Sequence, residues 1–360
     1  MNYFLFVLGV TTLIVGSDLL VRGASKLALS FGISPLVVGL TIVAFGTSSS
    51  EIAVSIGAIL NGTTDIAVGN VVCSNIFNIL FILGLSALIT PLVVNIQIIR
   101  QEIPIMIGAT LLLVLMAAGG HIVLWEGAIL FSLLLAYTVF LIVQSRKETS
   151  MAQAVFADKL KSSAVTVHNR HLVVQILFIV TGLALLIIGS HWLVTAAVAF
   201  AKALGVSDLI IGLTIVAAGT SMPEVATSIM AAIKGERDIA VGNIIGSNIF
   251  NILGCVGLST LVSGGAGLAV NAALMHFDMW VMLAVALACI PIFLTGREIA
   301  RWEGGVFLFY YIAYTTYLVL DSQAHDALKP FSMVMISFVL PITVITLLLV
   351  LIRQKYYSRD

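Results

Sequence analysis

Residues 39–51 read GLTIVAFGTSSSE, and residues 212–224 read GLTIVAAGTSMPE. Each stretch ends on a carboxylate, Glu51 or Glu224, which follows a Gly-Thr-Ser sequence in an otherwise apolar run. An acidic side chain inside such a run is costly and is usually retained for a function. Two such positions in one chain therefore predict a functional site that is built from two carboxylates.

The similarity extends beyond these two stretches. A second block follows each of them, DIAVGNVVCSNIFNIL at 65–80 and DIAVGNIIGSNIFNIL at 238–253. Residues 32–90 and 205–263 share 35 identities in 59 aligned positions at a constant offset of 173 (224 − 51), without a gap. One structural unit is therefore used twice in this chain.

The composition indicates a membrane protein. The chain is 60% apolar and 9% charged, and its mean hydropathy is +1.16, whereas an ordinary globular domain is about 25% charged. The apolar runs are about 20 residues long, which is the length of a helix that crosses a bilayer. We expect an all-α polytopic membrane protein. The N-terminal apolar run lacks a basic flank and a cleavage site, so we interpret it as a retained first helix rather than a signal peptide.

The apolar runs predict eleven spans. They lie near residues 3–24, 33–60, 66–89, 100–118, 122–143, 172–201, 207–233, 239–262, 272–294, 303–320 and 332–352. The longest loop, 144–171, is too short for a folded domain, so no soluble regulatory or nucleotide-binding module is expected. Asp18 and Arg22 lie four residues apart in the first span, where we expect a local ion pair.

The Lys and Arg residues predict the orientation, because cytoplasmic loops are enriched in them. With the N-terminus outside, fifteen of the 17 basic residues lie on the cytoplasmic side and only Lys202 and Lys329 lie outside. The C-terminus is then cytoplasmic, and the membrane is the cell (inner) membrane.

Five spans separate the start of one copy from the start of the other, and an odd number reverses the direction of crossing. The two copies are therefore predicted to be inverted repeats, an architecture typical of secondary transporters with a site near the bilayer midplane. The predicted organisation is a first five-helix repeat, a cytoplasmic linker, a second inverted five-helix repeat and an extra helix, at 1–144, 145–171, 172–320 and 332–352, with the repeated motifs at 32–90 and 205–263.

The polar residues of the motifs supply only oxygen ligands. Thr47, Glu51 and Ser55 recur at intervals of four, which places them on one face of a helix, and Thr220, Glu224 and Ser228 repeat the pattern. The second block adds the pairs Ser74 with Asn78 and Ser247 with Asn251. Carboxylate, amide, hydroxyl and carbonyl oxygens favour hard cations such as Ca²⁺ and Na⁺ over zinc, copper or iron.

Charge balance narrows the choice of cation. Two facing carboxylates repel each other, and one of them tends to hold a proton unless a cation lies between them. One Ca²⁺ or two Na⁺ neutralise the pair, and a third Na⁺ leaves the loaded site with one positive charge. Competition between these ions for one set of oxygens is a physical basis for exchange.

The motifs GTSSSE and GTSMPE, together with GNVVCSNIFN and GNIIGSNIFN, resemble the two alpha-repeats of the sodium/calcium exchanger (cation/calcium antiporter) superfamily. The chain looks most like the short prokaryotic branch. The resemblance implies that Glu51 and Glu224 are the central ligands for both ions. It further implies supporting roles for the remaining site residues. Hydroxyls and carbonyls would come from Thr47, Ser48, Thr220 and Ser221. The flanking sodium sites would take carbonyls from Ala44 and Ala217 and would be completed by Ser74 and Ser247, and the middle site would be lined by Asn78 and Asn251. By resemblance, spans one and six slide past a core of spans two, three, seven and eight.

The chain departs from the family pattern at three points. Ser50 stands where family members usually have proline, which predicts a softer helix break in the first copy. Asn251 stands where potassium-cotransporting members favour Asp, which argues against potassium dependence. The eleventh span exceeds the usual ten. Alternative structural roles remain open for the polar residues, as helix–helix hydrogen bonding for Asn78 and Asn251 and as capping of the broken helix for Thr47 and Ser48.

The leading hypothesis is a secondary antiporter that exchanges Ca²⁺ for Na⁺. A proton/calcium antiporter of the same fold is the main alternative, and a cation channel is a weaker one because the paired sites lie within one chain. The sequence contains no Walker motif, no HExxH and no nucleophile–base pair, so an enzyme is not expected. No cofactor is expected beyond the transported ions. The implied partners are small inorganic cations and the lipid bilayer, without nucleic acid, nucleotide or an obligate protein partner.

Overall fold

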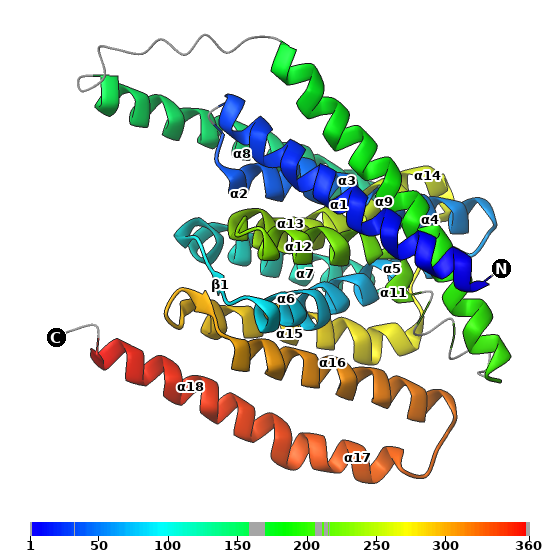
Figure 1. Ribbon diagram of the computed structural model, residues 1–360. Helices are drawn as coiled ribbons and strands as arrows, with labels where there is room; N and C mark the ends of the chain where they lie inside the picture. The colour runs from blue at the N-terminus through cyan, green and yellow to red at the C-terminus, as the bar shows by residue number, and fades with distance from the viewer. Residues whose placement is uncertain are drawn as a thin grey trace.

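The computed structural model describes residues 2–31, 33–157, 170–205, 211, 215 and 217–357. It is a stack of long helices, in which α1 lies beside α9 at one edge and α18 lies beside α16 at the other (Figure 1). The middle of the predicted linker and most of the first third of the predicted seventh span lie outside the described residues.

The first half contains five helical segments. They are α1 (Asn2–Phe31); α2 (Pro35–Val38), η1 (Gly39–Val43), α3 (Ala44–Thr47) and α4 (Ser49–Leu60); α5 (Thr64–Phe77), η2 (Asn78–Leu83) and α6 (Gly84–Ile89); η3 (Ile98–Glu102) and α7 (Ile103–Ala117); and α8 (Leu124–Ala157). Segments η1, η2 and η3 are π-helical, so the second, third and fourth segments are each a chain of short pieces.

The second half has corresponding segments and one more. They are α9 (Arg170–Ala203); α11 (Ala217–Thr220) and α12 (Met222–Ile233); α13 (Arg237–Ile249), η5 (Phe250–Val256), α14 (Gly257–Ser263) and η6 (Gly264–Ala266); η7 (Leu274–Asp278) and α15 (Met279–Leu294); α16 (Arg301–Ser322); and α17 (Leu328–Val334), η8 (Met335–Val339) and α18 (Leu340–Tyr357).

Within the described ranges, nine helices are long and apolar enough to cross a membrane. The other two predicted spans also contain helix, namely α16 and the segment of α11 and α12. One prediction is wrong: residues 144–157 do not belong to a loop, because α8 continues to Ala157. The Lys, Glu, Met, Gln and Ala residues there are good helix formers, so the helix persists beyond its apolar part.

Two short antiparallel ladders join the halves. Strand β1 (Leu92–Val93) pairs with β4 (Glu298–Ile299), and β2 (His121–Ile122) pairs with β3 (Leu268–Ala269). Each ladder links a loop of the first half to a loop of the second. The innermost segment is α13 with η5 and α14, whose most apolar part is fully buried. The last helical segment is the opposite case, because only 6% of its most apolar part is buried.

Helices α1 and α9 run antiparallel with their backbones in direct contact. The contacts pair Gly9 with Gly189 and Gly16 with Gly182. A Cβ at Gly182 would lie 2.7 Å from the Leu20 backbone nitrogen and 2.8 Å from the Gly16 carbonyl oxygen. Only glycine permits this approach, which is typical of helix pairs in membranes.

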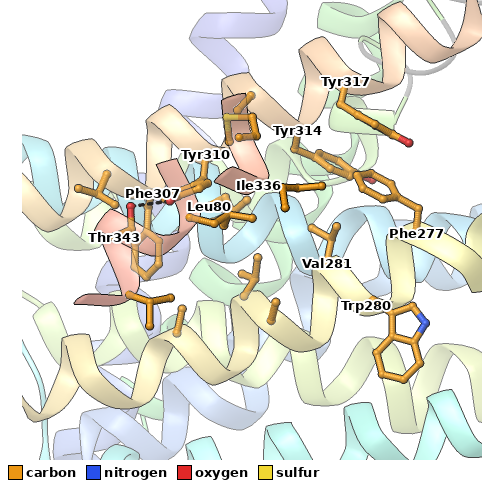
Figure 2. Close-up of a pocket in the computed structure, with 18 of the residues that line it drawn as sticks. Leu80, Phe277, Trp280, Val281, Phe307, Tyr310, Tyr314, Tyr317, Ile336 and Thr343 are labelled. Carbon is orange, nitrogen blue, oxygen red and sulfur yellow. Dashed lines mark hydrogen bonds between the residues drawn. The ribbon is translucent and has the colours of Figure 1, made fainter. Parts of the chain in front are cut away.

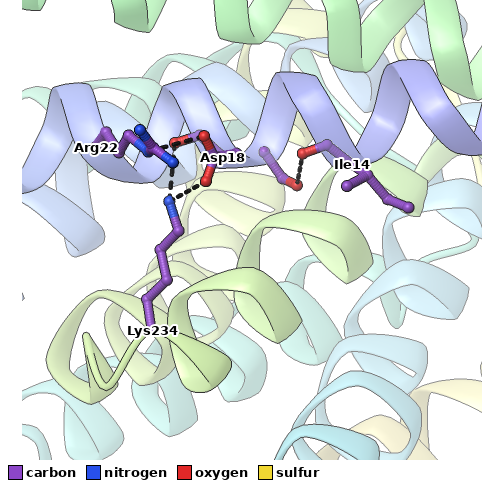
Figure 3. Close-up of polar contacts among 5 residues, drawn as sticks. Ile14, Asp18, Arg22 and Lys234 are labelled. Atoms are coloured by element: carbon purple, nitrogen blue, oxygen red, sulfur yellow. Dashed lines mark hydrogen bonds and ion pairs between the residues drawn. The ribbon is translucent and has the colours of Figure 1, made fainter.

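The predicted ion pair in the first helix is confirmed and has an additional partner. Arg22 Nε lies 2.8 Å from Asp18 Oδ2, and Lys234, at the end of α12, also pairs with Asp18 (Figure 3). Close to this pair, Ser25 donates a hydrogen bond to Glu236 Oε1 at 2.7 Å. These contacts tie α1 to the turn between α12 and α13.

We predict that Gly182→Ala lowers the thermal stability of the purified protein, because the added methyl group meets backbone atoms that cannot move away without separating α1 from α9. Melting of the protein in detergent measures the effect. Gly108→Ala in α7 is the control, because nothing lies within 4 Å of the Cβ there. Equal melting temperatures for the two variants would contradict the packing argument.

Candidate functional site

Both copies of the motif are broken helices. Helix α3 ends at Thr47 and α4 begins at Ser49, while α11 ends at Thr220 and α12 begins at Met222. The residues between them, Ser48 and Ser221, have ψ angles of −1° and 11°, away from the helical value. The break is therefore present in the first copy although its proline is missing.

Ser50 has a distinct role at the position of that proline. Its Oγ lies 2.9 Å from the carbonyl oxygen of Thr47 and 2.9 Å from that of Thr220, and 3.0 Å from Glu51 Oε2. Its equivalent, Pro223, has no hydroxyl. The first copy thus contacts the second through a side chain that has no symmetric counterpart.

The two carboxylates are buried and are each contacted from the opposite half. Ser221 donates to Glu51 Oε1 at 2.9 Å, and Ser48 donates to Glu224 Oε1 at 3.5 Å. The offset of 173 converts one contact into the other, so they are related by the repeat. Both Glu side chains have no exposed surface. Neither carboxylate forms an ion pair with a Lys or Arg of the described residues.

Asparagine amides cross between the halves in the same reciprocal manner. Asn78 Nδ2 donates to Asn248 Oδ1 at 3.0 Å, and Asn251 Nδ2 donates to Asn75 Oδ1 at 3.1 Å. Asn75 Nδ2 also donates to the Asn248 carbonyl at 3.2 Å. These bonds hold the amide groups of Asn78 and Asn251 in place through their nitrogens. The side-chain oxygens of these two amides accept no hydrogen bond from the described residues and can bind a ligand.

Several buried oxygens of the predicted site have no hydrogen-bond partner among the described residues. They are Asn78 Oδ1, Asn251 Oδ1, Glu224 Oε2 and Ser74 Oγ. A buried polar atom without a partner costs about 1–3 kcal/mol, and an unpaired carboxylate oxygen costs more. A cation that binds these oxygens would offset the cost, and a set made only of oxygens suits Na⁺ or Ca²⁺.

The remaining predicted residues lie around this centre. Thr47 Oγ1 is 3.4 Å from Ser247 Oγ, and it donates to the Ala44 carbonyl at 3.3 Å, so Thr47 and Ala44 lie beside Ser247. Thr220 donates to Asn70 Oδ1 at 3.4 Å. Ala217 is the first residue of α11, and its side chain lies outside the described part of the chain. Predicted residues of the two repeats thus meet in contacts across the halves, as Thr47 with Ser247 and Glu51 with Ser221.

Sequence reasoning missed a second pair of asparagines. Asn243 Nδ2 donates to Ser228 Oγ at 2.9 Å and its Oδ1 accepts from Thr47 Oγ1 at 3.1 Å. In the other half, Asn70 contacts Ser55 at 3.3 Å in the equivalent way. Asn75 and Asn248 were missed as well. Their identity in both copies was a usable signal, because all of them fall within the repeated second block.

The backbone at the asparagines is also unusual. The π-helical segment η2 begins at Asn78, and η5 contains Asn251 as its second residue. A π-helical turn leaves carbonyls in a looser pattern and is found frequently at functional sites. The π-helical turn thus recurs at equivalent positions of both halves, as other π-helical segments of this chain do.

Comparison with known protein families identifies this arrangement. The family model described as "Sodium/calcium exchanger protein" matches residues 1–143 and 174–320. The last helical segment, α17 with η8 and α18, lies beyond the matched residues.

Individual relatives are consistent with this family. The sodium/calcium exchanger MaX1 of Methanosarcina acetivorans is 33% identical over 346 residues, which cover 88% of this chain and 98% of the relative. The putative antiporter CaxA of Alkalimonas amylolytica is 40% identical over 264 residues, covering 71% and 78%. A crystal form of the sodium-calcium exchanger NCX_Mj soaked without Na⁺ and Ca²⁺ superposes with a TM-score of 0.74 at 30% identity, covering 88% of this chain and 98% of that one.

We predict that Asn243→Ala weakens ion binding, because it removes a partner from each of the Thr47 and Ser228 hydroxyls. A lost buried partner of this kind costs about 1–3 kcal/mol. The stabilisation of purified protein by added Ca²⁺, measured as a shift in melting temperature, should shrink. Asn61→Ala, at an exposed position after α4, should leave that shift unchanged. A full shift in the Asn243 variant would remove this residue from the site.

Proposed function

Because the chain belongs to the sodium/calcium exchanger protein family, we propose that it exchanges Ca²⁺ for Na⁺ across the cell membrane by alternating access. It is a multi-pass membrane protein of a cation/calcium antiporter family and not an enzyme. The observation that carries the choice of cargo is a set of buried oxygens that lack hydrogen-bond partners among the described residues, together with two carboxylates that form no ion pair with a Lys or Arg there.

We assign the ligands as follows. Glu51 and Glu224 are central and bind both ions, because each belongs to a broken helix and is oriented by a serine of the other half. The other proposed ligands are Thr47, Ser48, Thr220, Ser221, Ser74, Asn78, Ser247, Asn251 and the carbonyls of Ala44 and Ala217. Sodium ions occupy positions at which hydroxyl and amide oxygens predominate.

Charge explains how exchange would be coupled. With both carboxylates ionised, one Ca²⁺ or two Na⁺ bring the net charge of the site to zero. A site without cations would carry two negative charges in a low-dielectric interior, which is strongly unfavourable. The unloaded protein therefore reorients slowly, and ion leak is suppressed.

The proposed motion uses the inverted repeats, at 1–144 and 172–320. Helices α1 and α9 touch each other through glycine backbones and slide as a pair over the core that carries the ligands.

The Lys and Arg distribution favours an inner-membrane protein with its N-terminus outside and its C-terminus in the cytoplasm. A reporter enzyme that is active only in the cytoplasm, fused to the C-terminus, tests this orientation.

A transport assay separates the sodium mechanism from a proton mechanism. Inverted membrane vesicles that contain the protein should take up Ca²⁺ when an outward Na⁺ gradient is imposed, and a protonophore should not abolish the uptake. Uptake that requires only a pH gradient would replace Na⁺ by H⁺ in the mechanism. Flux that rises linearly with Ca²⁺ and needs no counter-ion would point to a channel.

We predict that Glu51→Gln and Glu224→Gln each reduce Ca²⁺ exchange to background, because the amide keeps the shape of the side chain and removes the charge that Ca²⁺ requires. Initial rates in the same vesicles, normalised to the amount of folded protein, measure the loss. Glu298→Gln, at an exposed position of β4, is the matched control and should transport normally. Wild-type rates in either site variant would refute the ligand assignment.

A further inference from the structure

The last helical segment leaves a large apolar cavity against the rest of the protein. The cavity has a volume of about 470 Å³ and lies between α15, α16 and the segment of α17, η8 and α18 (Figure 2). Leu80 of η2 also lines it. The cavity is therefore bounded on one side by the additional helix and on the other by a segment that begins at the ligand Asn78.

The cavity is long rather than round. On η7 and α15 the lining residues extend from His276 to Ile292, and on the last segment they extend from Phe331 to Leu347. Each range covers 16 residue steps (292 − 276 and 347 − 331), which correspond to about 24 Å of helix. The hydrocarbon core of a bilayer is about 30 Å thick, so the cavity follows most of one crossing.

The lining presents hydrocarbon, because several of its polar groups are paired within the protein. Tyr310 donates to Thr343 Oγ1 at 2.6 Å, and Tyr314 donates to Asp278 Oδ1 at 2.7 Å. Ser332 donates to the Leu328 carbonyl at 2.8 Å. A polar or charged ligand would gain little from these groups. A hydrocarbon chain has no hydrogen bonds to give up on entering the cavity.

Small side chains create the space. Ala284 and Ala288 lie one turn apart on α15 and face the cavity, where larger residues would fill it. The bond between Tyr310 and Thr343 joins α16 to α18 across the cavity, while most of α18 is exposed. The last helix therefore closes the cavity without packing tightly into it, and the opening between helices faces the membrane.

We propose that this cavity is a binding site for an acyl chain of a membrane phospholipid. Apolar cavities exclude water, and an empty one forfeits the dispersion contacts of its walls. The cavity lies at membrane depth, and its length matches an extended hydrocarbon chain rather than a compact ligand. Because Leu80 touches the cavity two residues after Asn78, the bound chain supports the segment that carries this ligand.

Native mass spectrometry of the full-length protein, extracted in a mild detergent with a phospholipid of 16–18-carbon chains, tests the proposal. The wild type should retain phospholipid, and Ala284→Leu with Ala288→Leu should reduce the retained fraction at least tenfold. Ala128→Leu makes one substitution of the same kind on the exposed face of α8 and should retain lipid like the wild type. Equal retention in the double variant and the wild type would overturn the proposal. So would a wild-type dimer that the double variant dissociates, because a second copy would then fill the cavity.

A second measurement does not depend on the folding of the filled variant. In a protein that keeps only Trp280, which lines the cavity, a phospholipid brominated along its chains should quench tryptophan fluorescence after free lipid is washed away in detergent. A protein that keeps only Trp125, which is exposed on α8, should not be quenched after the same washing. If the emission of each protein is the same with brominated lipid as with ordinary lipid, no chain is retained in the cavity and the proposal is refuted.

Discussion

Two buried carboxylates that form no ion pair with a Lys or Arg of the described residues are the constraint on which the rest of this membrane protein depends. Glu51 and Glu224 have no exposed surface, and their ionised forms are tolerated only if other groups and a cation balance them. The structure meets this need with broken helices, which bring Ser48 and Ser221 to the carboxylate of the opposite half. The hydrogen bonds among Asn75, Asn78, Asn248 and Asn251 join the same two halves through buried amides.

The two halves are related but not equivalent, and the difference is chemical. Pro223 breaks the second helix by lacking a backbone donor, whereas Ser50 reaches the carbonyl of Thr220 in the other half through its hydroxyl. At this position the first half therefore contributes a side-chain hydrogen bond to the other half, whereas Pro223 in the second half has no hydroxyl with which to form one. Likewise Ser74 Oγ lacks a partner, while its equivalent Ser247 lies 3.4 Å from Thr47. The proposed ion positions on the two sides of the centre therefore differ in the groups around them.

Much of the fold could be predicted because membrane helices are long apolar runs, and the repeat supplied the candidate site residues before any geometry was known. The exceptions have physical causes. The helical extension of α8 to Ala157 was missed because span prediction follows hydropathy, and this part of the helix is polar. Asn70 and Asn243 were missed, although both copies carry them, because a sequence does not show which asparagines reach the serine hydroxyls of the preceding helix. The cavity beside α18 depends on how helices pack, which periodicity does not reveal.

The ion pair at Asp18 adds an energetic asymmetry to the proposed motion. Displacing α1 from the end of α12 breaks the contacts of Asp18 with Lys234 and of Ser25 with Glu236. The repeat places His191 and Asn61 at the positions equivalent to Asp18 and Lys234 (18 + 173 and 234 − 173), and these two side chains cannot form the same pair. The glycine contacts between α1 and α9 are nearly symmetric, so they impose no preference of their own. The equilibrium between the two ends of the motion is therefore biased by charge at one end, and screening by salt should weaken that bias.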